Sequence, residues 1–265
     1  MCVIARTVSK VATTKITVLP SIKDGAPYQT VMYSCRIVSL QDNAMILPAW
    51  NPGNNPDKIQ LHSLEKCPYI LDNLSNMFKP ITGNNLKGVA KREYLPTYRV
   101  GNYIVSIAPK LSDVADVTPE LSIPSDLLAF LATSYSDDFS YIVAKFIGGD
   151  HKFHPLAYSH PRMENIFIPT LHWHKHFFQL WQNTSVGDFD HEIFMINGGL
   201  DIGDDRWRSF INIACDKAEP KITPDGLRAM CRIVLEGKYK NCDVILPWSL
   251  ETDKNLTPLI DEIFS

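Results

Sequence analysis

The sequence has no long basic run and no apolar stretch that could cross a bilayer. Its apolar stretches, such as residues 127–132 and 244–247, are far shorter than the roughly 20 residues of a membrane-spanning helix. The longest run of Lys and Arg is the pair Lys91–Arg92, and the formal net charge is -3. Such a charge distribution offers no basic surface for phosphates or anionic lipids, so neither nucleic acid nor a membrane is an expected partner.

Signals for secretion and for the common nucleotide-binding and hydrolase folds are absent too. Residues 1–20 contain no apolar core with a small-residue cleavage pattern, so we expect a soluble, intracellular protein of the cytoplasm. The 6 cysteines form no CxxC pair and no regular spacing, which is typical of reduced thiols. GxSxG, GxGxxG and GxxxxGK(S/T) do not occur, which removes the local signatures of α/β-hydrolases, Rossmann folds and P-loop proteins.

The chain is long enough for a substantial core and has strand-like patterns over much of its length. Short segments rich in Val, Ile and Thr predict strands at 3–8, 15–19, 29–38, 44–47 and 59–62. Helical spacing occurs at 69–78 and 125–135. Between 139 and 197, strand-like segments separated by short turns predict an antiparallel meander. We therefore predict a single α+β domain over 1–265, with an antiparallel sheet of many short strands and helices packed on it.

Histidine is concentrated in one part of the chain. Seven of the 8 histidines lie between His151 and His191, and the stretch PTLHWHKHFF at 169–178 has one at every second position. Successive side chains of a strand alternate between faces, so His172 and His174 are expected on one face. Two imidazoles placed in this way are suited to bind Zn²⁺ or Fe²⁺.

A third or fourth ligand has to come from elsewhere in the predicted meander. The nearby candidates are His154, His160, Asp188, Asp190, His191 and Glu192, so either an imidazole or a carboxylate can complete the set. His154 faces His172 in one strand register but not in the other. The predicted metal ligands are therefore His154, His172, His174 and His191. An open coordination position would make the protein a metal-dependent hydrolase or oxygenase, with Glu192 as the catalytic base and Asp190 as its alternative.

Two other functions compete with the metal enzyme. No spacing matches a specific metal motif such as HExxH, and histidines at strand ends often only form local hydrogen bonds. The chain can thus equally be a non-enzymatic structural or interaction protein. The third possibility is an N-terminal nucleophile hydrolase that uses Cys2, because the start Met-Cys is one from which methionine is readily removed. The α-amino group of Cys2 would then serve as its base.

Overall fold

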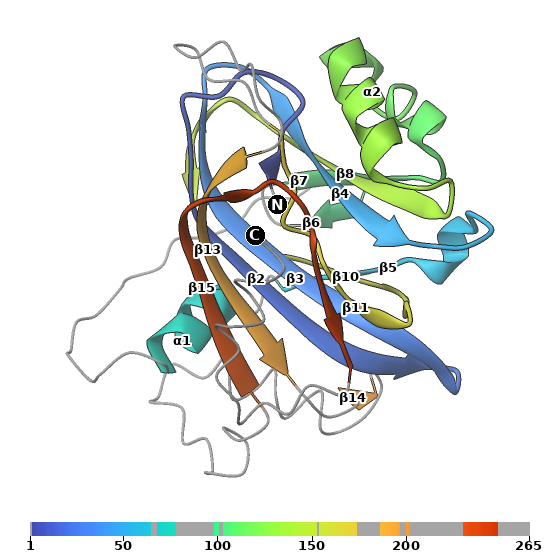
Figure 1. Ribbon diagram of the computed structural model, residues 1–265. Helices are drawn as coiled ribbons and strands as arrows, with labels where there is room; N and C mark the ends of the chain where they lie inside the picture. The colour runs from blue at the N-terminus through green and yellow to red at the C-terminus, as the bar shows by residue number, and fades with distance from the viewer. Residues whose placement is uncertain are drawn as a thin grey trace.

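The computed structural model describes residues 2–64, 68–77, 98–100, 103–152, 154–173, 186–196, 200–201 and 230–248. Within these residues the chain forms sixteen strands and two α-helices, so it is mainly β-structure (Figure 1). The predicted α+β class is therefore wrong. The helices α1 (Ile70–Met77) and α2 (Ser125–Ser134) are only 8 and 10 residues long and lie on opposite sides of the molecule, so they form no layer of their own (Figure 1). Neither of these two helices is long and apolar enough to cross a membrane.

A mixed sheet of eight strands is the largest unit of the fold. Its central hairpin is joined by the two-residue turn Asp24–Gly25, whose φ angles of 50° and 76° are those of a type I′ turn. The strand order is β15-β13-β2-β3-β10-β5, with β14 beside β2 and β9 beside β3. The strands are β2 (Lys10–Lys23), β3 (Ala26–Ser39), β5 (Gln60–His62), β9 (Gly149–Lys152), β10 (Leu156–Pro161), β13 (Val186–Ile196), β14 (Leu200–Asp201) and β15 (Met230–Lys240).

Three smaller sheets complete the described structure. An antiparallel sheet of four strands has the order β4-β8-β7-β6, β11 pairs with β16, and β1 pairs in parallel with β12. Their bounds are β1 (Cys2–Val3), β4 (Asn43–Trp50), β6 (Tyr98–Val100), β7 (Tyr103–Ala108), β8 (Phe139–Phe146), β11 (Asn165–Ile168), β12 (His172–Trp173) and β16 (Val244–Pro247). Short 3₁₀ helices occupy Pro56–Lys58, Leu111–Val114 and Pro119–Leu121. One hydrophobic core includes residues from all four sheets.

The predicted meander over 139–197 is also wrong. Strands do form at β8 to β13, but none of them pairs with the next one in sequence. Instead β8 pairs with β4 and β7, β9 with β3, β10 with β3 and β5, β11 with β16, β12 with β1, and β13 with β2 and β15. The turn after β8 makes no hairpin because it carries the chain from the four-stranded sheet to the eight-stranded sheet. The predicted ladder between His154 and His172 therefore does not exist.

The N-terminal strand runs through the interior of the protein. Val3, Ile4 and Ala5 are completely buried. The backbone N–H of Ile4 donates to the carbonyl of Trp173 at 2.8 Å, and that of Ala5 donates to a carbonyl of β4 at 2.9 Å. The first residues of the chain thus connect β12 to the four-stranded sheet.

Candidate functional site

Two of the histidines predicted as ligands are in direct contact. His172 on β12 and His191 on β13 are both buried, and their Nε2 atoms lie 3.2 Å apart. Because a neutral imidazole carries only one N–H, one Nε2–H donates and the other Nε2 accepts. The pair can therefore hold at most one extra proton without losing its hydrogen bond.

Asp190 lies beside this pair and is held by an irregular segment of β2. Its carboxylate accepts a hydrogen bond from the backbone N–H of Thr13, and its Oδ1 lies 3.6 Å from Nδ1 of His191. The register of β2 shifts between Ala12 and Lys15, and Thr13 has a positive φ of 54°. Burial raises the pKa of Asp190, although backbone hydrogen bonds act in the opposite direction. Bulges of this kind often adjoin functional sites.

The parallel pairing of β1 with β12 brings the backbone of Cys2 beside that of His172. In this register Cys2 lies opposite His172. The side-chain amide of Asn241 fixes His172 from the β15–β16 turn, because it accepts from the backbone N–H at 2.7 Å and donates to the carbonyl at 2.8 Å. Cys2 and His172, which the sequence suggested for two different functions, are therefore neighbours. His172 contacts His191, and Asp190 lies beside His191, so these four residues form a line.

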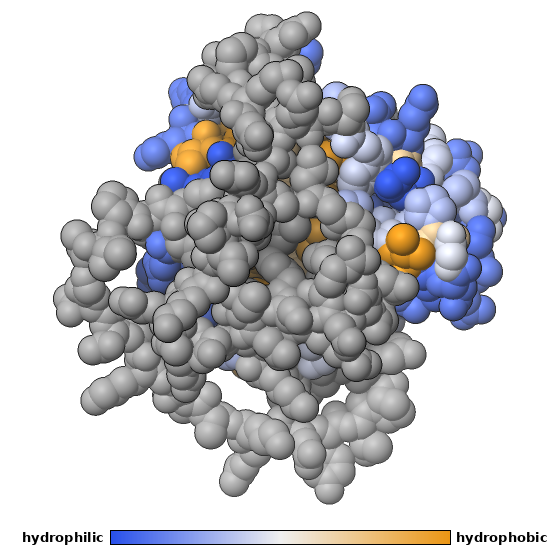
Figure 2. All heavy atoms as spheres, turned by 90° about the horizontal axis from the view of Figure 1, so that it is seen from below, coloured by the Kyte–Doolittle hydropathy of each residue, from blue (hydrophilic) through white to orange (hydrophobic). Residues whose placement is uncertain are grey.

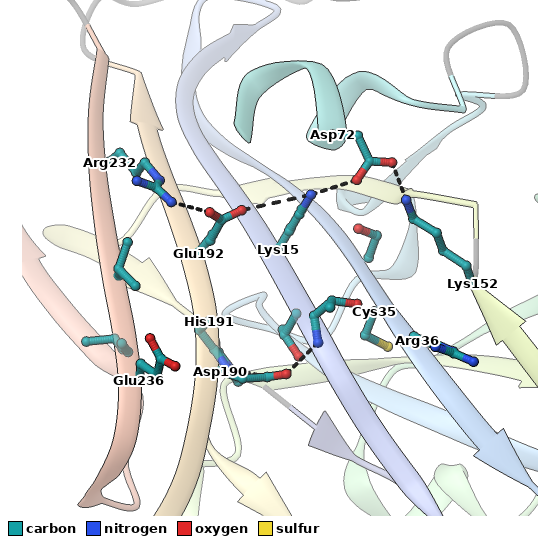
Figure 3. A pocket seen from close by; sticks show the side chains of 15 residues that line it. Lys15, Cys35, Arg36, Asp72, Lys152, Asp190, His191, Glu192, Arg232 and Glu236 are labelled. Carbon is teal, nitrogen blue, oxygen red and sulfur yellow. Dashed lines mark hydrogen bonds and ion pairs between the residues drawn. The ribbon is translucent and has the colours of Figure 1, made fainter. Parts of the chain in front are cut away.

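A cleft of about 600 Å³ opens beside His191 on the face of the eight-stranded sheet (Figure 3). A row of alternating charges crosses it, from Arg232 on β15 through Glu192, Lys15 and Asp72 to Lys152 on β9 (Figure 3). The Nζ atom of Lys15 lies 2.6 Å from Asp72 and 3.9 Å from Glu192.

The carboxylate of Glu192 takes part in two ion pairs of this row, with Arg232 and with Lys15. Burial raises its pKa, but hydrogen bonds and the charges of Arg232 and Lys15 outweigh that effect and hold the pKa below its usual range. An ionised, doubly paired carboxylate is a poor general base, because proton uptake would break both ion pairs. The role predicted for Glu192 therefore has no support from its surroundings, whereas Asp190 keeps a raised pKa.

The prediction of a Zn or Fe site is overturned. Across the described ranges, no group of three His, Cys, Asp or Glu side chains is arranged to hold a metal ion. His172 and His191 contact each other, while His154 lies in the loop before β10 with its Nδ1 2.9 Å from the carbonyl of Pro155. His174 lies outside the described residues. The physical reason is the absence of the meander, since the ligands were expected to meet across its strands.

One polar cluster gave no signal in the sequence. His62 Nε2 lies 2.7 Å from Ser159 Oγ, which lies 2.6 Å from Thr30 Oγ1, which in turn lies 3.0 Å from Ser21 Oγ. Its members come from four different strands and share no spacing, so only the fold brings them together. Because Ser159 is completely buried, this contact joins β5 to β10 and presents no nucleophile to solvent.

The described residues form a β-protein of several sheets, and a known structure has a similar fold. The crystal structure of baculovirus P35 is similar to this chain with a TM-score of 0.50 and 11% sequence identity. The match covers 93% of this chain and 99% of that chain. At this identity the likeness concerns the fold alone. A comparison of the sequence with models of protein families finds no match.

Proposed function

We propose that this chain is a non-enzymatic protein that acts by binding another protein. The proposal is carried by an exposed apolar corner formed by Leu40 and Ile147, whose side chains are 74% and 67% exposed. Leu40 lies in the turn from β3 to β4, and Ile147 lies in the turn from β8 to β9. The two turns are adjacent, because β3 pairs with β9 and β4 with β8 directly beside them.

Contacts between the turns hold this corner in one conformation. The N–H of Gly148 donates to Asp42 Oδ1 at 3.0 Å, and the turns are so close that a Cβ on Gly148 would lie 2.9 Å from the backbone of Gln41. An ordered corner loses little conformational freedom on binding. On the face shown in Figure 2, the visible surface of the described residues is mainly hydrophilic and includes a few hydrophobic side chains. Exposed aliphatic side chains on two neighbouring turns offer apolar surface that a partner can remove from water.

The test is a binding measurement with matched surface variants. Tagged protein is incubated with an extract of the cells that naturally express it, and the retained protein is purified and titrated. We expect saturable binding that weakens at least tenfold in the Leu40→Asp, Ile147→Asp double variant. Ile104→Asp, which changes an exposed aliphatic residue on β7, is expected to keep the affinity. Equal binding by both variants, or no saturable partner, would contradict the proposal.

A second function, an N-terminal nucleophile hydrolase, is favoured by the register that places Cys2 opposite His172. After removal of Met1, the thiol of Cys2 transfers its proton to the α-amino group or to the His172–His191 pair. The thiolate attacks an acyl carbon and forms a thioester, the leaving group takes up the proton, and water then hydrolyses the thioester. The adjacent Asp190 would stabilise the charged histidine pair.

This second function predicts an unusual reactivity of Cys2. Intact mass should show loss of Met1, and iodoacetamide should modify Cys2 faster than the other cysteines, as measured by peptide mapping. His172→Gln should slow the modification of Cys2 at least tenfold. His154→Gln, outside the line of residues, is the matched control. Retention of Met1, or equal reactivity of Cys2 and Cys242, would rule this function out.

A further inference from the structure

A second cavity, of about 340 Å³, lies at the end of α2 between β11 and the turn that joins β15 to β16. Its wall is mainly apolar. Phe139, Phe167 and Leu171 are buried in it, and Ile245 on β16 is 41% exposed. The ring centroids of Phe139 and Phe167 are 5.3 Å apart, so the wall includes packed aromatic rings.

The polar groups of this wall are already paired within the protein. The hydroxyl of Tyr135 donates to Asp243 Oδ2 at 2.7 Å. Oδ1 of Asp243 accepts from the backbone N–H groups of Thr170 and Leu171 at 2.7 and 2.8 Å. The amide of Asn241 is likewise used by the backbone of β12. A ligand therefore gains little from polar groups here, and one without polar groups leaves no broken hydrogen bond behind.

The charges that line the cavity distinguish further between classes of ligand. Asp243 is an acidic residue, and the described lining residues include no Lys, Arg or His. An anionic ligand would be desolvated beside a carboxylate without a compensating cation, which is unfavourable. Burial, followed by the charge of Asp243, raises the pKa of Cys242, so this lining thiol is mostly protonated at neutral pH, presents no anion to the cavity and reacts only slowly with an alkylating reagent.

We propose that this cavity binds a small, uncharged, aromatic or aliphatic molecule. The volume agrees with this class, because sites for small molecules begin at about 300 Å³. The aromatic rings supply edge-to-face contacts for an aromatic ligand. Among the described residues, the cavity shares none with the apolar corner or with the line of residues that begins at Cys2. The proposal of a ligand site therefore does not depend on either proposed function.

The test uses Cys242 as a reporter in the intact chain. Toluene, indole and benzoate are added separately, and the rate of Cys242 alkylation by iodoacetamide is followed by peptide mapping. We expect toluene and indole to slow the reaction of Cys242 at least fivefold at saturation and to leave that of the other cysteines unchanged. Benzoate, of similar size but negatively charged, should give less than a twofold effect. No protection by toluene and indole, or equal protection by benzoate, would overturn the proposal.

Matched variants locate the effect. Ile245→Trp places a larger side chain at the cavity and should abolish protection by toluene, whereas Ile104→Trp changes a residue of the same 41% exposure on β7 and should retain it. Methyl NMR of the unmodified sequence gives a second readout, in which toluene should shift the signals of Met163 and Leu171 in a saturable manner. Protection that survives in Ile245→Trp, together with unshifted methyl signals, would exclude binding at this cavity.

Discussion

Nζ of Lys15 lies 2.6 Å from Oδ1 of Asp72, and this ion pair ties α1 to the central strand β2. Nζ of Lys152 lies 2.5 Å from the other carboxylate oxygen, so a single aspartate joins the helix to two strands of the sheet. A helix of 8 residues has little stability of its own. The order of α1 therefore depends on these ion pairs and on its buried apolar side chains.

Replacement of Asp72 by Asn should lower the free energy of unfolding by about 1–3 kcal/mol, because the largely buried Lys15 and the exposed Lys152 both lose the carboxylate that they share. Hydrogen exchange of residues 70–77 should become faster than that of the sheet. Burial raises the pKa of Asp72, but its bonds to the two lysines outweigh this and lower it below 3.8. The stabilisation is thus present above the unfolded-state pKa and is lost as the pH falls through the lowered folded-state pKa.

Glu236→Gln provides the control for Asp72→Asn. Glu236 lines the same cleft, and the described residues give it no ion pair of this kind. We expect its removal to change the unfolding free energy by less than about 0.5 kcal/mol. Equal losses in both variants would show that the ion pairs of Asp72 do not hold α1.

The buried His160 and the half-buried His62 should make the fold sensitive to acid. Burial lowers the pKa of His62 and of His160 to about 4, from 6.5 in an exposed chain. The unfolded state then binds more protons between pH 6.5 and 4, so stability is complete above pH 6.5 and falls as the pH drops towards 4. The slope should approach about 2–3 kcal/mol per pH unit for two protons. Urea unfolding at a series of pH values measures it.

The double variant His62→Gln, His160→Gln removes both titrating groups. It therefore distinguishes a loss of stability caused by their protonation from a general loss of stability. It should be less stable at pH 7 yet show a much smaller loss between pH 6.5 and 4.5. Ile16→Val, which removes one methylene from the core, should lower stability by about 1 kcal/mol at every pH and keep the full slope. A slope that is unchanged in the histidine variant would assign the acid sensitivity to other groups.

The side chain of Asn241 acts in place of a neighbouring strand for β12. Its amide oxygen and nitrogen pair with the N–H and C=O of His172, a pattern that a backbone would otherwise provide. Asn241→Ala should therefore cost about 2–4 kcal/mol, since two buried backbone groups lose their partners. Asn241→Asp keeps the acceptor but loses the donor and should cost a comparable amount. Lys58→Ala, at an exposed position, is the control and should change the unfolding free energy by less than about 0.5 kcal/mol.

Local features of the fold were predictable from the sequence, because they depend on neighbouring residues. The alternation of Val, Ile and Thr located β3, β4 and β5, and the spacing of apolar residues located α1 and α2. The pairing of strands was not predictable. β12 has two residues, and its partners are β1 and the side chain of Asn241, which are distant in sequence and have no pattern in common with it.

The candidate site likewise has one part that could be predicted from the sequence and one part that could not. Cys2, His172 and His191 were recognised from their residue types, but the metal expected between the histidines required strands that do not pair. Their actual arrangement depends on the parallel entry of β1 beside β12, a long-range contact. The bulge that holds Asp190 is equally hidden, because Thr13 is a residue that rarely adopts positive φ and so gives no turn signal.

Thr13 itself should be a point of backbone strain. At φ 54° a β-branched residue costs about 1–3 kcal/mol, whereas glycine adopts this region freely and loses about 0.5–1 kcal/mol through chain entropy. Thr13→Gly should therefore leave the unfolding free energy unchanged or raise it by up to about 2 kcal/mol, while it keeps the N–H that donates to Asp190. Thr13→Val remains β-branched and should show no gain. If Thr13→Gly instead destabilises the protein by more than Thr13→Val does, the bulge beside Asp190 is held by the threonine side chain and not maintained against strain.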